Sequence, residues 1–248
     1  MPRPKVVAIA GGTRGLGLAT AELFLSRGYA VAVGSRSGGE GLPAGMLCCR
    51  LDVRRRDEQR EFVGAVVRRF GGLDVFVNCA GVSRWKAIEE IDEPFMEEVV
   101  QTSVLGTLWG CAAAATLLRE GGCIVNVSSL AGKRGSANNS AYCAAKFAVN
   151  GMTQALAKEL GPRGIRVNAV CPVYVQTDSL LASLAEPSSP AARQGVAAYL
   201  ASFASAQTAL GRLPTAEEVA RTVYFLASAE ASAITGQCLN VDCGALPQ

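Results

Sequence analysis

Tyr142 and Lys146 stand four residues apart in the segment SAYCAAKFAVNG, residues 140–151, with three small residues between them. On a helix this spacing places both side chains on one face, about one turn apart. A free phenol is a poor base near neutral pH, but a neighbouring ammonium group favours the phenolate. The pair could therefore give a proton to a carbonyl oxygen or take one from an alcohol. The alternative is that both residues only cover the surface or fill the core.

A glycine-rich segment follows the first strand-like run of the chain. The sequence AGGTRGLG covers residues 10–17, with Gly11, Gly15 and Gly17 spaced as G-x-x-x-G-x-G. Glycine allows a tight turn and lets a pyrophosphate approach the backbone N–H groups at the start of a helix, where the helix dipole favours negative charge. A glycine cluster alone is a weak signal, but its place directly after a strand favours a dinucleotide site.

The end of the second strand-like run indicates which dinucleotide is bound. An NAD site usually carries Asp or Glu about 20 residues after the glycine loop, where the carboxylate accepts from the ribose 2′-hydroxyl. Here Ser35 and Arg36 occupy that place. Arg36, together with Arg14 of the glycine loop, could donate charge-assisted hydrogen bonds to a 2′-phosphate. The pattern favours NADP(H); the alternative is that both arginines are only exposed surface residues.

Short apolar runs alternate with helix-length segments such as 58–70 and 154–160 along nearly the whole chain. Such alternation predicts crossover connections, parallel strands and a sheet covered on both faces. We therefore expect an α/β fold, a Rossmann-type doubly wound parallel sheet of about seven strands, in one domain over residues 1–248. The predicted strands are residues 5–10, 30–35, 46–50, 74–78, 123–127, 165–170 and 238–242.

Two helix starts can be predicted, and one segment departs from the alternation. Asp92 with Pro94 is typical of a helix N-terminus, and Thr215 with Glu218 has the spacing of a capping box. Residues 173–213 are rich in Ala, Ser and Pro and interrupt the regular pattern. A long insertion inside a compact domain is usually disordered or functional, so we expect a substrate lid here.

Composition argues against several other classes of protein. The formal net charge is +3, and basic residues are dispersed apart from RRR at 54–56, so nothing favours a nucleic-acid partner. The nine cysteines form no C-x-x-C pair and the chain has no histidine, which favours reduced thiols in a cytoplasmic protein over disulfides or a metal site. No apolar run resembles a signal peptide or reaches the ~18 residues that span a membrane.

Seven motifs, in order along nearly the whole chain, resemble the short-chain dehydrogenase/reductase family in its small single-domain branch. They are GGTRGLG (11–17), LDV (51–53), NCAG (78–81), VSS (127–129), YCAAK (142–146), CPVYVQT (171–177) and ITGQCLNVD (234–242). Each motif alone is weakly specific, but the ordered set is very specific. The resemblance implies an NADP(H)-dependent oxidoreductase that moves hydride between the nicotinamide and a ketone or secondary alcohol of medium size, with Tyr142 as acid/base.

The same resemblance implies roles for other residues. Ser129 is expected to hydrogen-bond the substrate oxygen, with Ser128 as the less favoured alternative, and Lys146 to hold the nicotinamide ribose while it tunes Tyr142. Ser103 occupies the slot of a fourth catalytic residue, which in the family is Asn in an N-x-x-G pattern. The expected cofactor-binding residues are Gly11, Thr13, Arg14, Gly15, Leu16, Gly17, Ser35, Arg36, Asp52, Val53, Asn78, Ala80, Gly81, Tyr142, Lys146, Pro172, Val175 and Thr177.

The sequence departs from the family's pattern at three positions. Ser103 stands where the family has Asn, so the proton relay from Lys146 through water is expected to be rearranged or slower. Val173 replaces the Gly of C-P-G, and Cys243 replaces a Gly of V-D-G-G. None of these changes removes the Tyr and Lys pair, so we expect catalysis to persist.

Two other functions stay open at this point. One is a 3-oxoacyl-carrier-protein reductase; the other is an NADP-binding protein with weak redox activity, because Ser103 replaces the family Asn. The family usually assembles through the helices that carry residues 93–118 and 140–160, so we expect a homotetramer or a dimer.

Four residues near the expected site could be part of it. Trp85 and Lys86 follow the NCAG motif, and Lys133 and Arg134 lie between the expected serine and tyrosine. They either reach the rim of the substrate pocket or are solvated loop residues, and the second interpretation is preferred.

Overall fold

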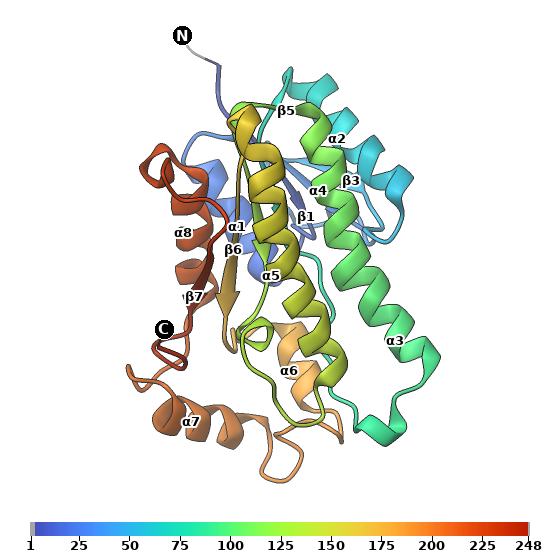
Figure 1. The fold of residues 1–248 in the computed structure, drawn as a ribbon, viewed down its shortest axis with the longest axis vertical. Coiled ribbons are helices and arrows are strands. Elements are labelled where there is room, and N and C mark those ends of the chain that lie inside the picture. Colours follow the sequence, from blue (N-terminus) through green and yellow to red (C-terminus); the bar gives the residue numbers. More distant parts are fainter. Residues whose placement is uncertain (1–2, 248) are drawn as a thin grey trace.

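A parallel sheet of seven strands runs through the computed structural model, which describes residues 3–247 (Figure 1). Its order is β3-β2-β1-β4-β5-β6-β7, and every neighbouring pair is parallel. The strands are β1 Val6–Ala10, β2 Ala30–Ser35, β3 Leu47–Arg50, β4 Leu73–Asn78, β5 Leu118–Val127, β6 Arg166–Pro172 and β7 Cys238–Val241. The predicted fold class is confirmed, and β5 begins earlier than expected.

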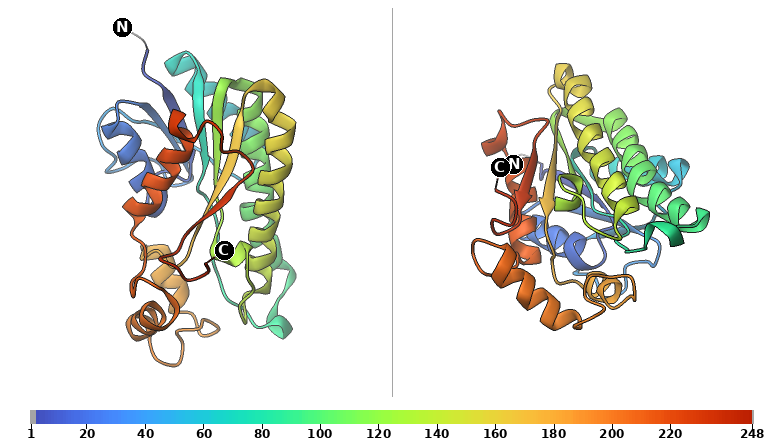
Figure 2. Two further views of the ribbon diagram at one scale, coloured as in Figure 1. Left: turned by 60° about the vertical axis from the view of Figure 1, so that its left-hand side comes forward. Right: turned by 60° about the horizontal axis from the view of Figure 1, so that its bottom comes forward.

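Helices cover both faces of this sheet (Figures 1 and 2). Helices α1 and α8 pack against each other on one face, while α2, α4 and α5 cover the other. The helices are α1 Gly15–Ser26, α2 Arg56–Phe70, α3 Glu93–Val99, α4 Gly106–Leu117, α5 Ser140–Leu160, α6 Asp178–Leu184, α7 Val196–Gln207 and α8 Ala216–Ala227.

The continuous apolar character of the central strands follows from burial on both faces. In β1, Ile9 belongs to one core cluster together with Phe24 of α1, while Ala8 belongs to the other together with Phe62 of α2. Successive side chains of a strand point to opposite faces, so a strand with a helix on each side needs apolar residues at every position. All five residues of β1 are accordingly buried.

The strand order reverses at β1, which has β2 on one side and β4 on the other. The chain therefore leaves β1 and β4 toward opposite faces of the sheet, and a crevice opens outside their carboxyl ends. Ala10 and Asn78, which end these two strands, are register partners. The glycine-rich loop thus begins at the place where open α/β sheets bind their ligands.

Helix ends follow the signals in the sequence. The Asp92 carboxylate accepts a hydrogen bond from the Phe95 backbone N–H at 3.0 Å, and Thr215 and Glu218 form the complete capping box. Between α3 and α4 the chain makes a π-helical turn over Val100–Leu105 that contains Ser103. Such turns are rare and frequently occur near functional sites.

The segment 173–213 is more ordered than its composition suggests. It forms α6 and α7, which lie at the carboxyl end of the sheet (Figures 1 and 2). A small apolar cluster that includes Trp85, Leu184 and Leu200 holds these helices on the body of the molecule. The expectation of an irregular segment is therefore wrong. Apolar residues on two short helices can bury each other even though each helix is too short to show a clear 3.6-residue pattern in the sequence.

Three further observations bear on the class of protein. The stretch Glu93–Leu117 is one helical run long and apolar enough to cross a membrane, but 44% of its most apolar window is buried, as in an ordinary core helix, so it is a weak sign of a membrane span. Among residues 3–247, no group of three or more Cys, Asp or Glu side chains is placed to hold a metal ion. All nine cysteines are free thiols.

Candidate active site

A cavity of about 1120 Å³ extends along the carboxyl edge of the sheet. One end is formed by the glycine loop and the ends of β2 and β3, and the other end by α5, α6 and α7. This volume exceeds the range typical of a single drug-sized ligand, so a dinucleotide and a second molecule can share it.

The glycine loop can fold tightly on itself and against Ala80 only because its residues lack side chains. A Cβ atom on Gly17 would lie 2.0 Å from the carbonyl oxygen of Gly11, and one on Gly11 would lie 2.7 Å from the backbone nitrogen of Ala80. Helix α1 starts here, and no side chain caps its first N–H groups. Those donors and the positive end of the helix dipole face the cavity, so the loop fits a dinucleotide pyrophosphate.

Cationic side chains surround the cavity near the end of β2. Arg14, Arg36 and Arg54 line it, together with Asp52. Arg54 pairs with Asp52 at 2.5 Å, and this hydrogen bond lowers the pKa of the Asp52 carboxyl below its usual range, with a smaller contribution from Arg36. Sequence reasoning did not single out Arg54, which lies in the RRR run at residues 54–56. Net positive charge remains at this end, as a phosphate group requires.

Tyr142 and Lys146 both come from α5 and line the same cavity. The Lys146 ammonium lies 5.6 Å from the centroid of the Tyr142 ring and donates a hydrogen bond to the Val127 carbonyl oxygen at 2.9 Å. Lys146 is only 4% exposed. A fixed positive charge that is shielded from water stabilises negative charge on a nearby phenol oxygen more strongly than a solvated one does.

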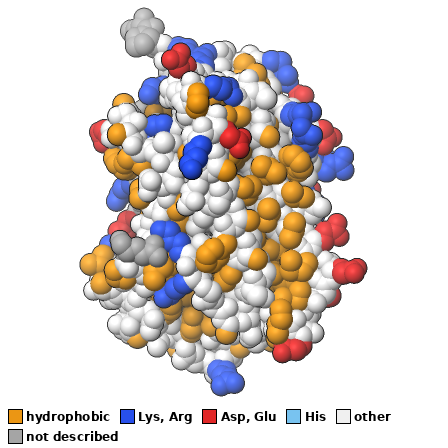
Figure 3. Space-filling model, in the orientation of Figure 1, with side chains coloured by type: hydrophobic (Ala, Val, Ile, Leu, Met, Phe, Trp, Pro, Cys, Tyr) orange, Lys and Arg blue, Asp and Glu red, His pale blue; other side chains and the backbone are white. Residues whose placement is uncertain are grey.

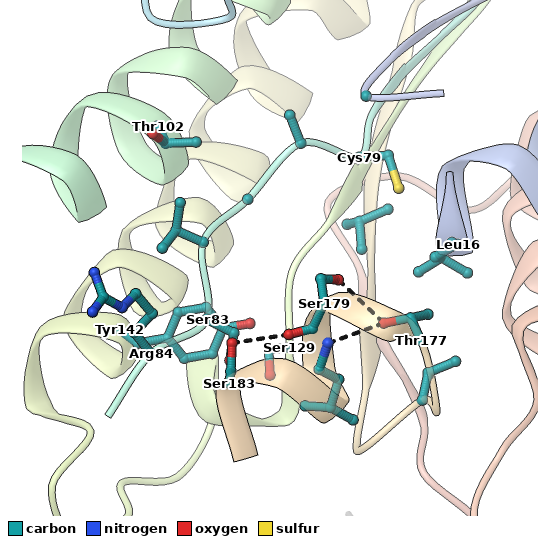
Figure 4. A pocket seen from close by; sticks show the side chains of 18 of the residues that line it. Leu16, Cys79, Ser83, Arg84, Thr102, Ser129, Tyr142, Thr177, Ser179 and Ser183 are labelled. Carbon is teal, nitrogen blue, oxygen red and sulfur yellow. Dashed lines mark hydrogen bonds between the residues drawn. The ribbon is translucent and has the colours of Figure 1, made fainter. Parts of the chain in front are cut away.

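The structure separates the roles of the two neighbouring serines. Ser128 is buried, and its hydroxyl donates to the backbone carbonyl of Lys146 at 3.3 Å. The Ser129 oxygen accepts from the Ala131 backbone N–H at 3.1 Å, which leaves its hydroxyl hydrogen free to donate. Both line the cavity, but Ser129 is the better donor for a substrate oxygen. Figure 4 labels Ser129, Tyr142 and Ser183 of α6 among the side chains that line the pocket.

Most of the sequence-predicted residues share this cavity, but Asn78 and Ser103 do not line it. The buried Asn78 amide donates to the Asn126 side-chain oxygen at 2.9 Å, so the expectation that it lines the adenosine side is wrong. The strand turns this side chain into the core, where a buried amide needs a polar partner. Ser103 is fully buried, and its oxygen accepts from the Val82 backbone N–H at 3.4 Å.

Ser103 and the Lys146 ammonium both lie near Gly81. A Cβ atom on Gly81 would be 3.4 Å from the lysine nitrogen and 3.9 Å from the serine oxygen. No direct hydrogen bond joins the two side chains among the described contacts, in which Lys146 donates to Val127 instead. Ser103 therefore provides no direct hydrogen bond to the lysine in place of the missing Asn.

The four rim candidates divide into two pairs. Trp85 and Arg134 line the cavity, and Trp85 is 5% exposed, so the interpretation of Trp85 as a solvated loop residue is wrong. Lys86 pairs with Asp92 at 2.9 Å and, like Lys133, is not among the lining residues. The apolar cluster under α6 and α7 explains the burial of Trp85.

Three aromatic side chains of the cavity were missed by sequence reasoning. Tyr174 follows β6, and Tyr199 and Phe203 lie on α7. The last two are four residues apart, a spacing that places them on one helix face and could have been recognised. They line the end of the cavity formed by α7, where a substrate has room.

The other two departures from the family pattern, Val173 and Cys243, differ in the backbone strain that they cause. Val173 lies outside the positive-φ region, so it needs no glycine-like conformation. Cys243 has a φ of 54°, a left-handed conformation that favours glycine. The turn after β7 is therefore strained at this residue.

The parallel sheet, the glycine loop and the Tyr–Lys pair in one cavity are together typical of an oxidoreductase. Residues 10–245 match the family described as enoyl-(acyl carrier protein) reductase. The 3-oxoacyl-[acyl-carrier-protein] reductase FabG of Thermotoga maritima is 35% identical over 251 residues, covering 97% of each chain. The chain belongs to the short-chain dehydrogenase/reductase family, as its motifs predict.

Solved structures show the same relationship. The aldohexose dehydrogenase of Thermoplasma acidophilum matches with a TM-score of 0.88 and 30% identity over 99% of this chain and 98% of that one. ElxO with NADP bound matches with a TM-score of 0.85 and 29% identity over 99% of this chain and 100% of that one.

Proposed function

We propose that this protein is an NADP(H)-dependent oxidoreductase that interconverts a ketone and a secondary alcohol of medium size. The observation that carries the proposal is that Tyr142, Lys146 and Ser129 line the same cavity as the glycine loop. A proton donor and a dinucleotide cradle in one enclosed space are the two parts that carbonyl reduction needs.

The residues at the substrate end divide the work of proton transfer. The bound nicotinamide supplies hydride to the carbonyl carbon. Tyr142 gives its phenol proton to the carbonyl oxygen, and Ser129 donates a hydrogen bond to the same oxygen. The Lys146 ammonium stabilises the phenolate that Tyr142 becomes. In the alcohol-oxidising direction the same groups act in reverse.

The preference for NADP over NAD rests on Arg36 and Arg14, which line the cavity where the adenosine ribose is expected. A 2′-phosphate would receive charge-assisted hydrogen bonds from them. Arg36→Ala should weaken NADPH binding by roughly 10-fold or more while changing NADH binding little. Equal affinity of the wild type for NADPH and NADH would contradict this preference.

The activity is tested by NADPH consumption against a broad panel of ketones. Tyr142→Phe should abolish turnover while NADPH still binds, since the substitution removes only the hydroxyl group. Silence of the wild type across the panel, with tight NADPH binding, would instead support an NADP-binding protein with weak redox activity, which Ser103 motivates.

The runner-up substrate class is a 3-oxoacyl group on a carrier protein. The similarity to the FabG of Thermotoga maritima favours it. Acetoacetyl thioesters therefore belong in the ketone panel. A thioester reduced at least ~100-fold more efficiently than every free ketone would favour this class.

We further propose that the protein is a cytoplasmic homotetramer or dimer, with α6 and α7 as the substrate lid. Phe147 on α5 and Leu117 on α4 are 49% and 40% exposed, and hydrophobic side chains gather where these helices lie side by side (Figure 3). Such a face suits a neighbouring copy. Light scattering gives the oligomeric state, and Phe147→Asp should lower the measured mass. Cell fractionation tests the location.

A further inference from the structure

The wall of the cavity near α7 is aromatic. The Tyr174 ring packs edge-on against Tyr199 and Phe203, with centroid distances of 5.7 and 4.9 Å. The two tyrosine hydroxyls bond each other at 2.9 Å, so each has a polar partner within the wall. The wall can therefore offer its rings to a substrate, and aromatic rings bind flat apolar groups well.

The acidic side chains at this end of the cavity share one cationic partner. Glu98 of α3 and Glu186, which follows α6, both line it. Arg84 pairs with both, at 3.2 Å and 3.1 Å. This three-residue group has two negative charges and one positive charge bound together, so Arg84 has no free charge to offer a ligand.

Arg134 is a different kind of cation. It lines the cavity and is half-buried, and its backbone carbonyl accepts from the thiol of Cys143, the residue next to Tyr142. Its guanidinium donates only a long hydrogen bond, 3.5 Å, to the Ala245 carbonyl, and no carboxylate in residues 3–247 pairs with it. Burial and the bond to Tyr199 raise the pKa of Tyr174, while the charge of Arg134 opposes that rise, which shows that the guanidinium is within electrostatic reach of the aromatic wall.

The position of Arg134 is supported by the C-terminal turn. Asp242 accepts hydrogen bonds from the backbone N–H groups of Gly244 at 3.0 Å and Leu246 at 2.9 Å. These bonds fix the Ala245 carbonyl, which faces the guanidinium. Arg134 is thereby held at the cavity with most of its donors unused.

We propose that the substrate is a carbonyl compound with a flat apolar body and a carboxylate group, in which the body lies against Tyr174, Tyr199 and Phe203 and the carboxylate pairs with Arg134. This inference rests on the proposed ketoreductase function and narrows its substrate class. A planar guanidinium binds a carboxylate through two parallel hydrogen bonds, and shelter from water strengthens them.

Matched substrates test both parts of the proposal. 4-Oxo-4-phenylbutanoate and its methyl ester differ in the charge and by one methyl group, while 4-oxopentanoate has the same acid spacing without the ring. The acid should have a kcat/KM about 10- to 100-fold above that of the ester, the range expected for one charge-assisted contact. It should exceed that of 4-oxopentanoate by roughly 10-fold. An ester as good as the acid would overturn the carboxylate assignment.

Variants of Arg134 test whether this residue causes the preference for the acid over the ester. Arg134→Gln should bring the acid-to-ester ratio near one, whereas Arg134→Lys should retain part of it. The control is Arg193→Gln, an exposed arginine between α6 and α7 that does not line the cavity, and it should keep the wild-type ratio. A wild-type ratio in Arg134→Gln would overturn the proposal. NADPH titration and thermal unfolding verify that each variant is folded.

A binding arm separates this inference from the proposed function. Quenching of bound NADPH fluorescence reports whether the acid and the ester bind, with or without turnover. Binding of the acid that depends on Arg134, without turnover of any ketone, supports the carboxylate site and refutes the ketoreductase. Turnover of ketones without any preference for the acid supports the ketoreductase and refutes the carboxylate site. If Arg134→Gln lowers turnover of acetoacetyl-coenzyme A but not that of acetoacetyl-pantetheine, a phosphate is the anion and the carboxylate assignment is wrong.

Discussion

Replacing Lys146 with methionine removes the positive charge beside Tyr142 while keeping a side chain of similar length. The ammonium is 5.6 Å from the centre of the phenol ring and 4% exposed as a residue. At this distance and an effective dielectric constant of ~20, a unit charge stabilises a phenolate by about 3 kcal/mol. Loss of that stabilisation should lower kcat by roughly 100-fold.

The assay is single-turnover oxidation of NADPH at saturating cofactor, with a ketone that the wild type reduces. Saturation separates the chemical step from weaker cofactor binding, because Lys146 is also expected to hold the ribose. Lys146→Arg, which keeps the charge, should lose less activity than Lys146→Met. The substitution also removes the donor to the Val127 carbonyl, so unfolding by urea must show that the variant is native under assay conditions. A Lys146→Met enzyme within about 3-fold of the wild-type kcat would refute the electrostatic reasoning.

Three further predictions concern the cofactor loop and the stability of the fold. Gly17→Ala should weaken NADPH binding at least ~10-fold in a fluorescence titration, since its Cβ would lie 2.0 Å from the Gly11 oxygen. Arg212 and the Thr215 N–H lower the pKa of Glu218 to about 2, so this carboxylate stabilises the fold above its unfolded pKa and the contribution disappears as pH falls from about 4.3 toward 2. The difference in Tm between wild type and Glu218→Gln should therefore shrink over that range. Cys243→Gly should raise the free energy of unfolding by about 0.5–1 kcal/mol, because φ is 54° there.

Each of these has a matched control. Gly64→Ala in α2 meets only the flexible end of Arg68 and should bind NADPH normally. Glu89→Gln removes an exposed carboxylate that forms no ion pair among the described residues, and the difference in Tm between this variant and the wild type should change little over the same pH range. Cys243→Ala keeps a Cβ atom in the left-handed conformation and should not stabilise the protein; a gain equal to that of glycine would exclude backbone strain as the cause.

The aromatic wall and the polar network behind the cavity show where local sequence patterns stop being informative. Tyr199 and Phe203 have the spacing of one helix face, but their segment was expected to be irregular, and no local feature indicates that this face meets Tyr174. Asn78 ends β4 at the cavity edge, yet its amide turns toward Asn126. The direction of a side chain at a strand end depends on which polar partner the neighbouring strand offers.

The sequence by itself determined the features that depend on short-range geometry. Strand and helix alternation dictates a parallel sheet, glycines dictate a loop that a pyrophosphate can approach, and four-residue spacing on a helix keeps Tyr142 beside Lys146. Only the tertiary structure decided that Ser103 lies near Gly81 without a hydrogen bond to the lysine, and that Arg134 meets the C-terminal turn at the substrate end. Those arrangements join segments far apart in the chain, and packing of the whole fold sets their distances.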